Sequence, residues 1–418
     1  MLWTTPFIAA CWLLVASLPA QAADPCRLCH ASGVRITGIH RGVACPACHQ
    51  RGGLIMINPA DRAVASAGCT GCHRGYQRIY AHAMGSRAPE LAFIARSYGR
   101  MDPGFEQKNC AGCHLQGCTD CHGSGHAIRR PSAETCSRCH KGYYVGWDYF
   151  GRAPRDEHER YQRGRRRQGE TFLKMLPDVH QQRGMTCSSC HTMQSLINGQ
   201  RAAKGCTDCH RPSPTVLEHR IAAHLKKLEC AACHAAWAAQ EYGTFYLQFT
   251  AGTVESPFSS LTVTRNGYAK GVYLKRQDLP PLGFNRRGNV APIRPQFIAY
   301  YSKIGKGKAI GRENRLLAAE WRAFTPHTIQ RGTALCDDCH ANPRRFLLEP
   351  AQDRLYDLQR DGMTLASFWN QTGQTLTNGS FIDQRYYTQL ATKTDTYTRA
   401  YVEKWKRFIT PDAGSLRP

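Results

Sequence analysis

The feature that most constrains the fold is a five-residue motif, Cys-x-x-Cys-His, which occurs ten times in the chain. The ten copies use 20 of the 21 cysteines and leave only Cys11. With 21 Cys and 18 His placed at random among 418 residues, fewer than one copy is expected. Numbered one to ten along the chain, the motifs begin at Cys26, Cys45, Cys69, Cys110, Cys118, Cys136, Cys187, Cys206, Cys230 and Cys336.

Covalent haem attachment explains why a histidine directly follows every second cysteine. Two thiols at this spacing anchor one edge of the porphyrin, and the adjacent imidazole binds the iron. A disulfide scaffold has no need of that histidine. Zinc or iron–sulfur sites, the alternative, need sets of four ligands at matched spacing. We therefore expect ten covalently bound haem c groups. The attachment cysteines are Cys26, Cys29, Cys45, Cys48, Cys69, Cys72, Cys110, Cys113, Cys118, Cys121, Cys136, Cys139, Cys187, Cys190, Cys206, Cys209, Cys230, Cys233, Cys336 and Cys339, and the proximal ligands are His30, His49, His73, His114, His122, His140, His191, His210, His234 and His340.

The basic composition does not require a nucleic-acid partner. The formal net charge is +24, from 55 Lys and Arg against 31 Asp and Glu. Twenty ionised propionates and ten ferric centres would bring the oxidised protein to about +14, and the reduced protein to about +4. Arginine side chains are well suited to pair with these carboxylates. We expect no binding to nucleic acid.

Residues 1–22 resemble a secretory signal peptide. They contain no charged residue, and an apolar stretch from Phe7 to Leu18 precedes a small-residue cleavage site near Ala22 or Ala23. Cys11 superficially matches a lipoprotein box, but the apolar run continues beyond it, so we expect it to leave with the signal peptide. No later segment approaches the length of a membrane span. The mature chain is therefore expected to be periplasmic or extracellular, without a membrane span.

The motifs are distributed very unevenly. Nine lie within residues 23–234, and residues 235–418 carry only the tenth. Haem faces must supply most of the buried apolar surface of the first segment. We expect a mainly irregular and α-helical multihaem cytochrome c fold organised around stacked haems, with helical turns at the motifs and little sheet. Motifs one to three and seven to nine are related by a constant shift of 161 residues, which indicates a duplicated three-haem unit (26–73 and 187–234) or a coincidence.

The segment 235–418 is predicted to form a small α+β cap that carries the tenth haem. Residues 242–285 are rich in β-branched and aromatic side chains, and Asn266-Gly267 predicts a hairpin turn among them. The apolar residues of 312–323 predict a helix. A last helix is predicted at 395–409, where aromatic residues recur at helical spacing.

Eight histidines remain as candidates for the distal position on the iron. They are His40, His82, His126, His158, His180, His219, His224 and His327. Of these, His158 and one of His219 and His224 are the weaker candidates. His40, His180, His224 and His327 lie five to nine residues before a motif. Eight candidates cannot serve ten irons, so at least two irons use Met, Lys, another group or a partner chain, or keep an open position.

The long interval between His140 and Cys187 contains the ingredients of a catalytic site. Lys141, Tyr143, Tyr144 and His158 lie there among many arginines. An open haem six with cationic groups and a proton donor is what reduction of an oxyanion requires. In the alternative, the aromatic side chains cover a haem face and the arginines bind propionates.

Four longer strings carry a resemblance to a narrower family. Residues 142–149, 153–164, 286–297 and 326–332 resemble the multihaem cytochromes of selenite/tellurite-reduction operons. The resemblance implies electron transfer beyond the inner membrane, with other cytochromes, membrane quinol-oxidising proteins or outer-membrane conduits as partners. The leading hypothesis is an electron carrier or conduit. The alternatives are an oxyanion-reducing oxidoreductase with an open haem, and a structural protomer of a cytochrome filament that shares ligands between chains.

Overall fold

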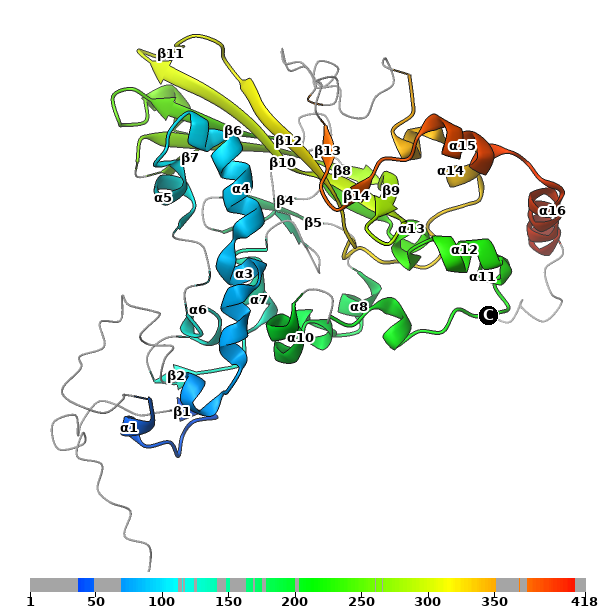
Figure 1. Ribbon diagram of the computed structural model, residues 1–418, viewed down its shortest axis with the longest axis horizontal. Coiled ribbons are helices and arrows are strands. Elements are labelled where there is room, and N and C mark those ends of the chain that lie inside the picture. Colours follow the sequence, from blue (N-terminus) through cyan, green and yellow to red (C-terminus); the bar gives the residue numbers. More distant parts are fainter. Residues whose placement is uncertain are drawn as a thin grey trace, which may run out of the picture. The chain divides into compact units, whose positions relative to one another are not determined.

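The computed structural model describes residues 37–48, 69–111, 115, 117–123, 126–140, 148–150, 163–167, 170–174, 178–199, 203–259, 261–264, 266–350, 368 and 374–409 (Figure 1). The chain forms two compact units. The first contains residues 1–74 and 117–130, and the second contains residues 75–116 and 131–418. Each unit is described by itself.

The first unit contains two short helices and one small sheet. The helices are α1 (Cys45–Cys48) and α6 (Thr119–His122), and residues 69–72 are also helical. Strand β1 (Thr37–Gly38) pairs in parallel with β2 (Ala127–Ile128). Gly38 has a φ of 79°, and a Cβ atom there would lie 2.7 Å from the carbonyl oxygen of Ile128. Only glycine therefore fits this pairing without strain.

The second unit combines short helices with a nine-stranded sheet. Its α-helices are α3 (Ala83–Ser86), α4 (Ala88–Arg96), α5 (Phe105–Asn109), α7 (Ala133–Ser137), α8 (Val179–Gln182), α9 (Cys187–Cys190), α10 (Met193–Asn198), α11 (Leu217–Arg220), α12 (Ala222–Lys227), α13 (Cys230–His234), α14 (Asp337–His340), α15 (Gln384–Ala391) and α16 (Asp395–Ile409). Its 3-10 helices are η2 (Tyr76–Ala81), η3 (Tyr98–Arg100), η6 (Cys206–Asp208), η7 (Ser256–Phe258) and η8 (Pro343–Phe346). The helix predicted at 395–409 is confirmed by α16.

The large sheet runs in the order β13-β12-β10-β6-β8-β7, with β11 and β9 also paired to β10 and β14 paired to β9. Its strands are β6 (Trp237–Phe249), β7 (Thr262–Thr264), β8 (Tyr268–Asp278), β9 (Leu282–Asn285), β10 (Val290–Gly305), β11 (Lys308–Ala309), β12 (Arg315–Ala323), β13 (Thr375–Leu376) and β14 (Gly379–Ser380). A separate sheet has the order β3-β5-β4, from β3 (Asp148–Phe150), β4 (Arg163–Arg167) and β5 (Glu170–Lys174). The predicted hairpin is confirmed, because Thr264 of β7 pairs with Tyr268 of β8 across Asn266-Gly267.

The helix predicted at 312–323 is wrong, because residues 315–323 form strand β12. This strand is covered on both faces: Trp321 packs into one core cluster, and Leu317 and Ala318 pack against another. A register shift against β10 lies between Ala318 and Leu316. Burial on two faces together with a bulge removes the strict alternation that identifies a strand in a sequence.

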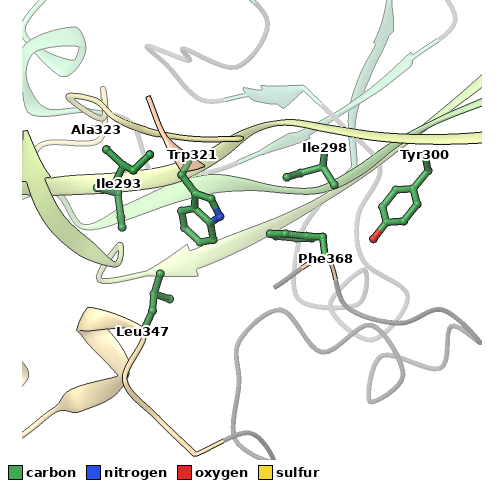
Figure 2. Packing of buried hydrophobic residues seen from close by; sticks show 8 residues of the cluster. Ile293, Ile298, Tyr300, Trp321, Ala323, Leu347 and Phe368 are labelled. Carbon is green, nitrogen blue, oxygen red and sulfur yellow. The ribbon is translucent and has the colours of Figure 1, made fainter. Parts of the chain in front are cut away.

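Strand β10 separates the two main core clusters. Ile298 and Tyr300 point into the cluster shown in Figure 2, where the indole of Trp321 lies between Ile293 and Phe368. The neighbouring residues of β10 belong to the opposite cluster, which α4 and α5 cover with aromatic side chains. Successive side chains of a strand point to opposite faces, so a strand buried on both sides divides the core in this way.

Strand β6 carries a partly buried acidic side chain, Glu241, at a bulge. The register with β8 shifts between Glu241 and Gly243. One carboxylate oxygen of Glu241 accepts hydrogen bonds from Thr244 Oγ1, at 2.7 Å, and from the backbone N–H of Ile298, at 3.3 Å. Desolvation nevertheless raises the pKa of Glu241 to about 7.

Strand β10 holds motif nine on one side of its helix α13, and the segment that follows β12 holds it on the other. Before the helix, the N–H of Glu229 donates to Val290 O at 2.9 Å. After the helix, the N–H of Ala236 donates to Thr328 O at 3.0 Å, and Ala235 bridges to Ile329. These contacts fix the position of the motif.

Within the described ranges, no helix has the length and apolar character needed to cross a membrane.

Candidate haem-binding sites

The described Cys-x-x-Cys-His motifs form a common helical turn. In each of six motifs the backbone N–H of the histidine donates to the carbonyl oxygen of the first cysteine, with N···O distances of 2.8 to 3.0 Å. The histidines are His73, His122, His140, His191, His210 and His340. In motif nine the whole sequence is helix α13. Residues four apart lie on one side of a helical turn, so the turn presents both cysteines and the histidine together.

Five motif histidines each lie against one of the remaining histidines. The ring centres are 6.0 Å apart for His40 and His73, 6.3 Å for His191 and His327, 5.8 Å for His180 and His210, 6.1 Å for His219 and His234, and 6.2 Å for His224 and His340. Two imidazoles that bind one metal ion from opposite sides, through bonds of about 2 Å, have ring centres about 6 Å apart. The five pairs therefore fit the two axial positions of a haem iron.

The pairing does not follow sequence distance. None of the four candidates that lie shortly before a motif is paired with that motif. His327, which precedes motif ten, lies against the histidine of motif seven, and His224, which precedes motif nine, lies against that of motif ten. Axial ligands must approach a haem from opposite faces. A short segment that leads directly into an attachment site lies beside the haem edge held by that site, so it is too short to reach the opposite face. Both His219 and His224 have a motif histidine as neighbour.

Backbone carbonyls orient several of these rings. The Nδ1 atom of His122 lies 3.0 Å from Arg129 O, that of His234 lies 3.1 Å from Gln330 O, and that of His340 lies 2.6 Å from Leu390 O. A proton on Nδ1 that is donated to a carbonyl leaves Nε2 free for a metal. Burial also lowers the pKa of His327 to about 4 and lowers the pKa values of His140 and His224. Burial therefore favours the neutral imidazole, which is the form that binds iron.

The other candidate residues are placed differently or lie outside the described residues. The Nε2 atom of His82 is 2.8 Å from Ile197 O. The carbonyl of His126 accepts the N–H of Thr37 beside β2. Lys141, Tyr143, Tyr144 and His158 of the suggested catalytic site lie outside the described residues, as do Cys26, Cys29, His30, His49, Cys113 and His114.

Cysteine side chains of different motifs touch in both units. In the first unit, the side chains of Cys69 and Cys118, from motifs three and five, lie in contact. In the second unit, such contacts join Cys136 to Cys187 and Cys206 to Cys230. Motifs six and seven therefore adjoin, and so do motifs eight and nine.

Two further links complete a series of adjacent motifs in the second unit. The guanidinium of Arg345 donates to the carbonyl of Ala232 in motif nine and lies 3.7 Å from the sulfur of Cys339 in motif ten. The carboxylate of Asp178 contacts His180, the neighbour of motif eight, and accepts the N–H of Ile329 at 2.6 Å. Ile329 is two residues beyond His327, the neighbour of motif seven. Motifs six to ten are thus connected in chain order.

The sequence pattern of the Cytochrome c3 family matches residues 179–245. These residues include motifs seven, eight and nine, together with His180, His219 and His224. The matched segment is a multihaem c-type cytochrome. Its cofactor is covalently bound haem c, and its role is electron transfer with redox partners. Neither the curated proteins nor the solved structures gave a significant match to the chain.

Asp178 and Arg345 were not predicted from the sequence. Asp178 is the N-cap of α8 and accepts the N–H of His180 at 2.8 Å. An aspartate directly before a short helix that carries a candidate ligand is a signal of capping, and it could have drawn attention to this residue. Arg345 had no such signal, because its two contacts come from motifs distant in the sequence.

Proposed function

We propose that this protein is an exported decahaem c-type cytochrome that conducts electrons between other redox proteins. The ten motifs support the number of haems, and residues 1–22 support export to the periplasm or beyond. The cytochrome c3 match supports the electron-transfer chemistry. The resemblance of four sequence strings supports a place in respiratory or extracellular electron transfer linked to selenite or tellurite reduction, with cytochromes, quinol-oxidising proteins or outer-membrane conduits as partners.

We propose the five histidine pairs as axial ligands of haems three, seven, eight, nine and ten. When bound, haem c supplies reversible one-electron exchange at its iron. With haem bound, the paired imidazoles would hold the iron from both faces, and these five sites would then offer no open position to a substrate. At these sites the residues favour electron transfer over catalysis.

The connected series of motifs six to ten is the observation that carries the proposal. Cysteine contacts join two pairs of motifs, and Asp178 and Arg345 join the remaining neighbours. Electron tunnelling slows steeply with distance, so cofactors on adjoining motifs exchange electrons faster than cofactors on separate molecules do. The series therefore serves as a continuous path.

The path is tested by removing one haem from the middle of the series. Flash photoreduction delivers fewer than one electron per oxidised molecule, and the subsequent redistribution among haems is followed by visible absorbance. In the wild type we expect a redistribution whose rate does not depend on protein concentration. Replacing Cys206 and Cys209 by Ala removes haem eight, and most of this unimolecular phase should be lost.

The matched control removes a haem outside the series. Replacing Cys45 and Cys48 by Ala abolishes haem two, which belongs to the first unit, and should leave the unimolecular phase among haems six to ten intact. Haem counts and far-UV circular dichroism establish that both variants are otherwise assembled. A wild-type redistribution that depends entirely on protein concentration would contradict the proposed path.

A further inference from the structure

Asp178 holds the ring of His180 by a charged contact. One oxygen of its carboxylate lies 2.8 Å from Nδ1 of His180 and also accepts the backbone N–H of the same residue at 2.8 Å. The other oxygen accepts the N–H of Ile329. The Asp178 side chain is only 4% exposed, so water screens the carboxylate charge weakly.

This environment differs from that of the other oriented rings. The rings of His122, His234 and His340 face neutral backbone carbonyls, whereas that of His180 faces a carboxylate. A carboxylate that accepts the Nδ1 proton makes the imidazole a stronger donor to its metal. The negative charge also favours the ferric over the ferrous iron, because the ferric form carries one more positive charge.

We infer that Asp178 is a positioning residue that lowers the reduction potential of haem eight. The inference rests on the proposed role of His180 as the distal ligand paired with His210. Haem eight lies in the middle of the series of motifs six to ten. A lowered potential there makes haem eight an uphill step, which electrons pass through without accumulating on it.

The alternative is that Asp178 serves only as a helix cap. Asn and Ser cap helices about as well as Asp does, so they separate the two roles. Asp178→Asn keeps the shape and removes the charge, and Asp178→Ser keeps a capping oxygen that no longer reaches the imidazole. Asp383→Asn is the matched control, because Asp383 caps α15 by accepting the N–H of Tyr386 at 2.7 Å.

The measurement is a spectroelectrochemical redox titration of the holoprotein, combined with EPR of the oxidised state. In D178N and D178S, the ratio of reduced to oxidised haem in one component should rise about tenfold at a fixed potential. This corresponds to a positive shift of about 59 mV in the reduction potential of that haem. That component should be missing from the variant without Cys206 and Cys209. The EPR signal of one low-spin haem should change with it, and D383N should match the wild type.

Unchanged potentials in well-folded D178N and D178S would show that Asp178 serves only as a helix cap, and would overturn the inference. If D178N does not fold, D178E is compared with D178S, and the potential should remain low only where the charge is kept. Loss of the ligand itself is tested separately by His180→Ala. If H180A leaves the number of low-spin haems unchanged, the proposed ligation fails. If it removes one while D178N shifts nothing, only the role of Asp178 fails.

Discussion

Replacing Glu241 by Gln should stabilise the protein at high pH and have little effect at low pH. Burial raises the pKa of Glu241 from 4.5 to about 7. In the unfolded chain this carboxyl ionises above its ordinary pKa, whereas in the folded protein it keeps its proton until the pH approaches 7. The contribution of Glu241 to the free energy of unfolding therefore falls as the pH rises from 4.5 to 7, and its full destabilising effect is present above pH 7.

The size of the penalty follows from the shift. Each pKa unit corresponds to 1.36 kcal/mol, so the ionised Glu241 costs about 3 kcal/mol at pH 8. In E241Q the amide oxygen of the new side chain can still accept from Thr244 and from the N–H of Ile298. The free energy of unfolding is expected to fall by about 3 kcal/mol per M urea. The urea midpoint of E241Q should therefore lie about 1 M above that of the wild type at pH 8.

Urea unfolding followed by far-UV circular dichroism at pH 5 and pH 8 measures this difference. Subtracting the midpoint of the wild type from that of E241Q at each pH cancels the effect of every other titrating group. Glu313→Gln, at an exposed position, is the matched control and should show no such difference at either pH. A midpoint shift of E241Q that is the same at pH 5 and pH 8, or absent at both, would refute the reasoning.

Three further predictions concern the haems and export. The intact mass should exceed that of the processed polypeptide by ten haem units, and fewer than nine would contradict the occupation of every motif. The mature N-terminus should lie near Ala23, whereas an acylated Cys11 in the native protein would make it a lipoprotein. His327→Ala should convert one haem from low to high spin by EPR, and the high-spin signal should vanish when Cys187 and Cys190 are also replaced by Ala. Its persistence would place the ligand on another haem.

Local features of the fold could be predicted from the sequence. The motif turns depend on residues four apart, the hairpin on Asn266-Gly267, and helix α16 on a stripe of aromatic residues at helical spacing. Strand β12 could not be predicted, because both of its faces are buried and a bulge interrupts its pattern.

The candidate haem sites likewise contain residues that could be predicted from the sequence and residues that could not. The attachment residues can be read from each motif, because thiols and imidazole lie within one turn. The choice of opposite ligand depends on tertiary structure, as the placement of His327 against His191 illustrates. Asp178 shows the same limit, because its contact with Ile329 joins segments that are distant in the chain.

The position of His327 has a consequence for biogenesis. Under the proposed export from the N-terminus, motif seven would reach the site of haem attachment well before residue 327 does. His327 follows β12, which pairs with β10, and β10 pairs in turn with β6, so this part of the sheet closes only after residue 323 has been delivered. With the proposed ligation, haem seven would lack its second imidazole until this part of the sheet closes, so the order of folding would set when its coordination is completed.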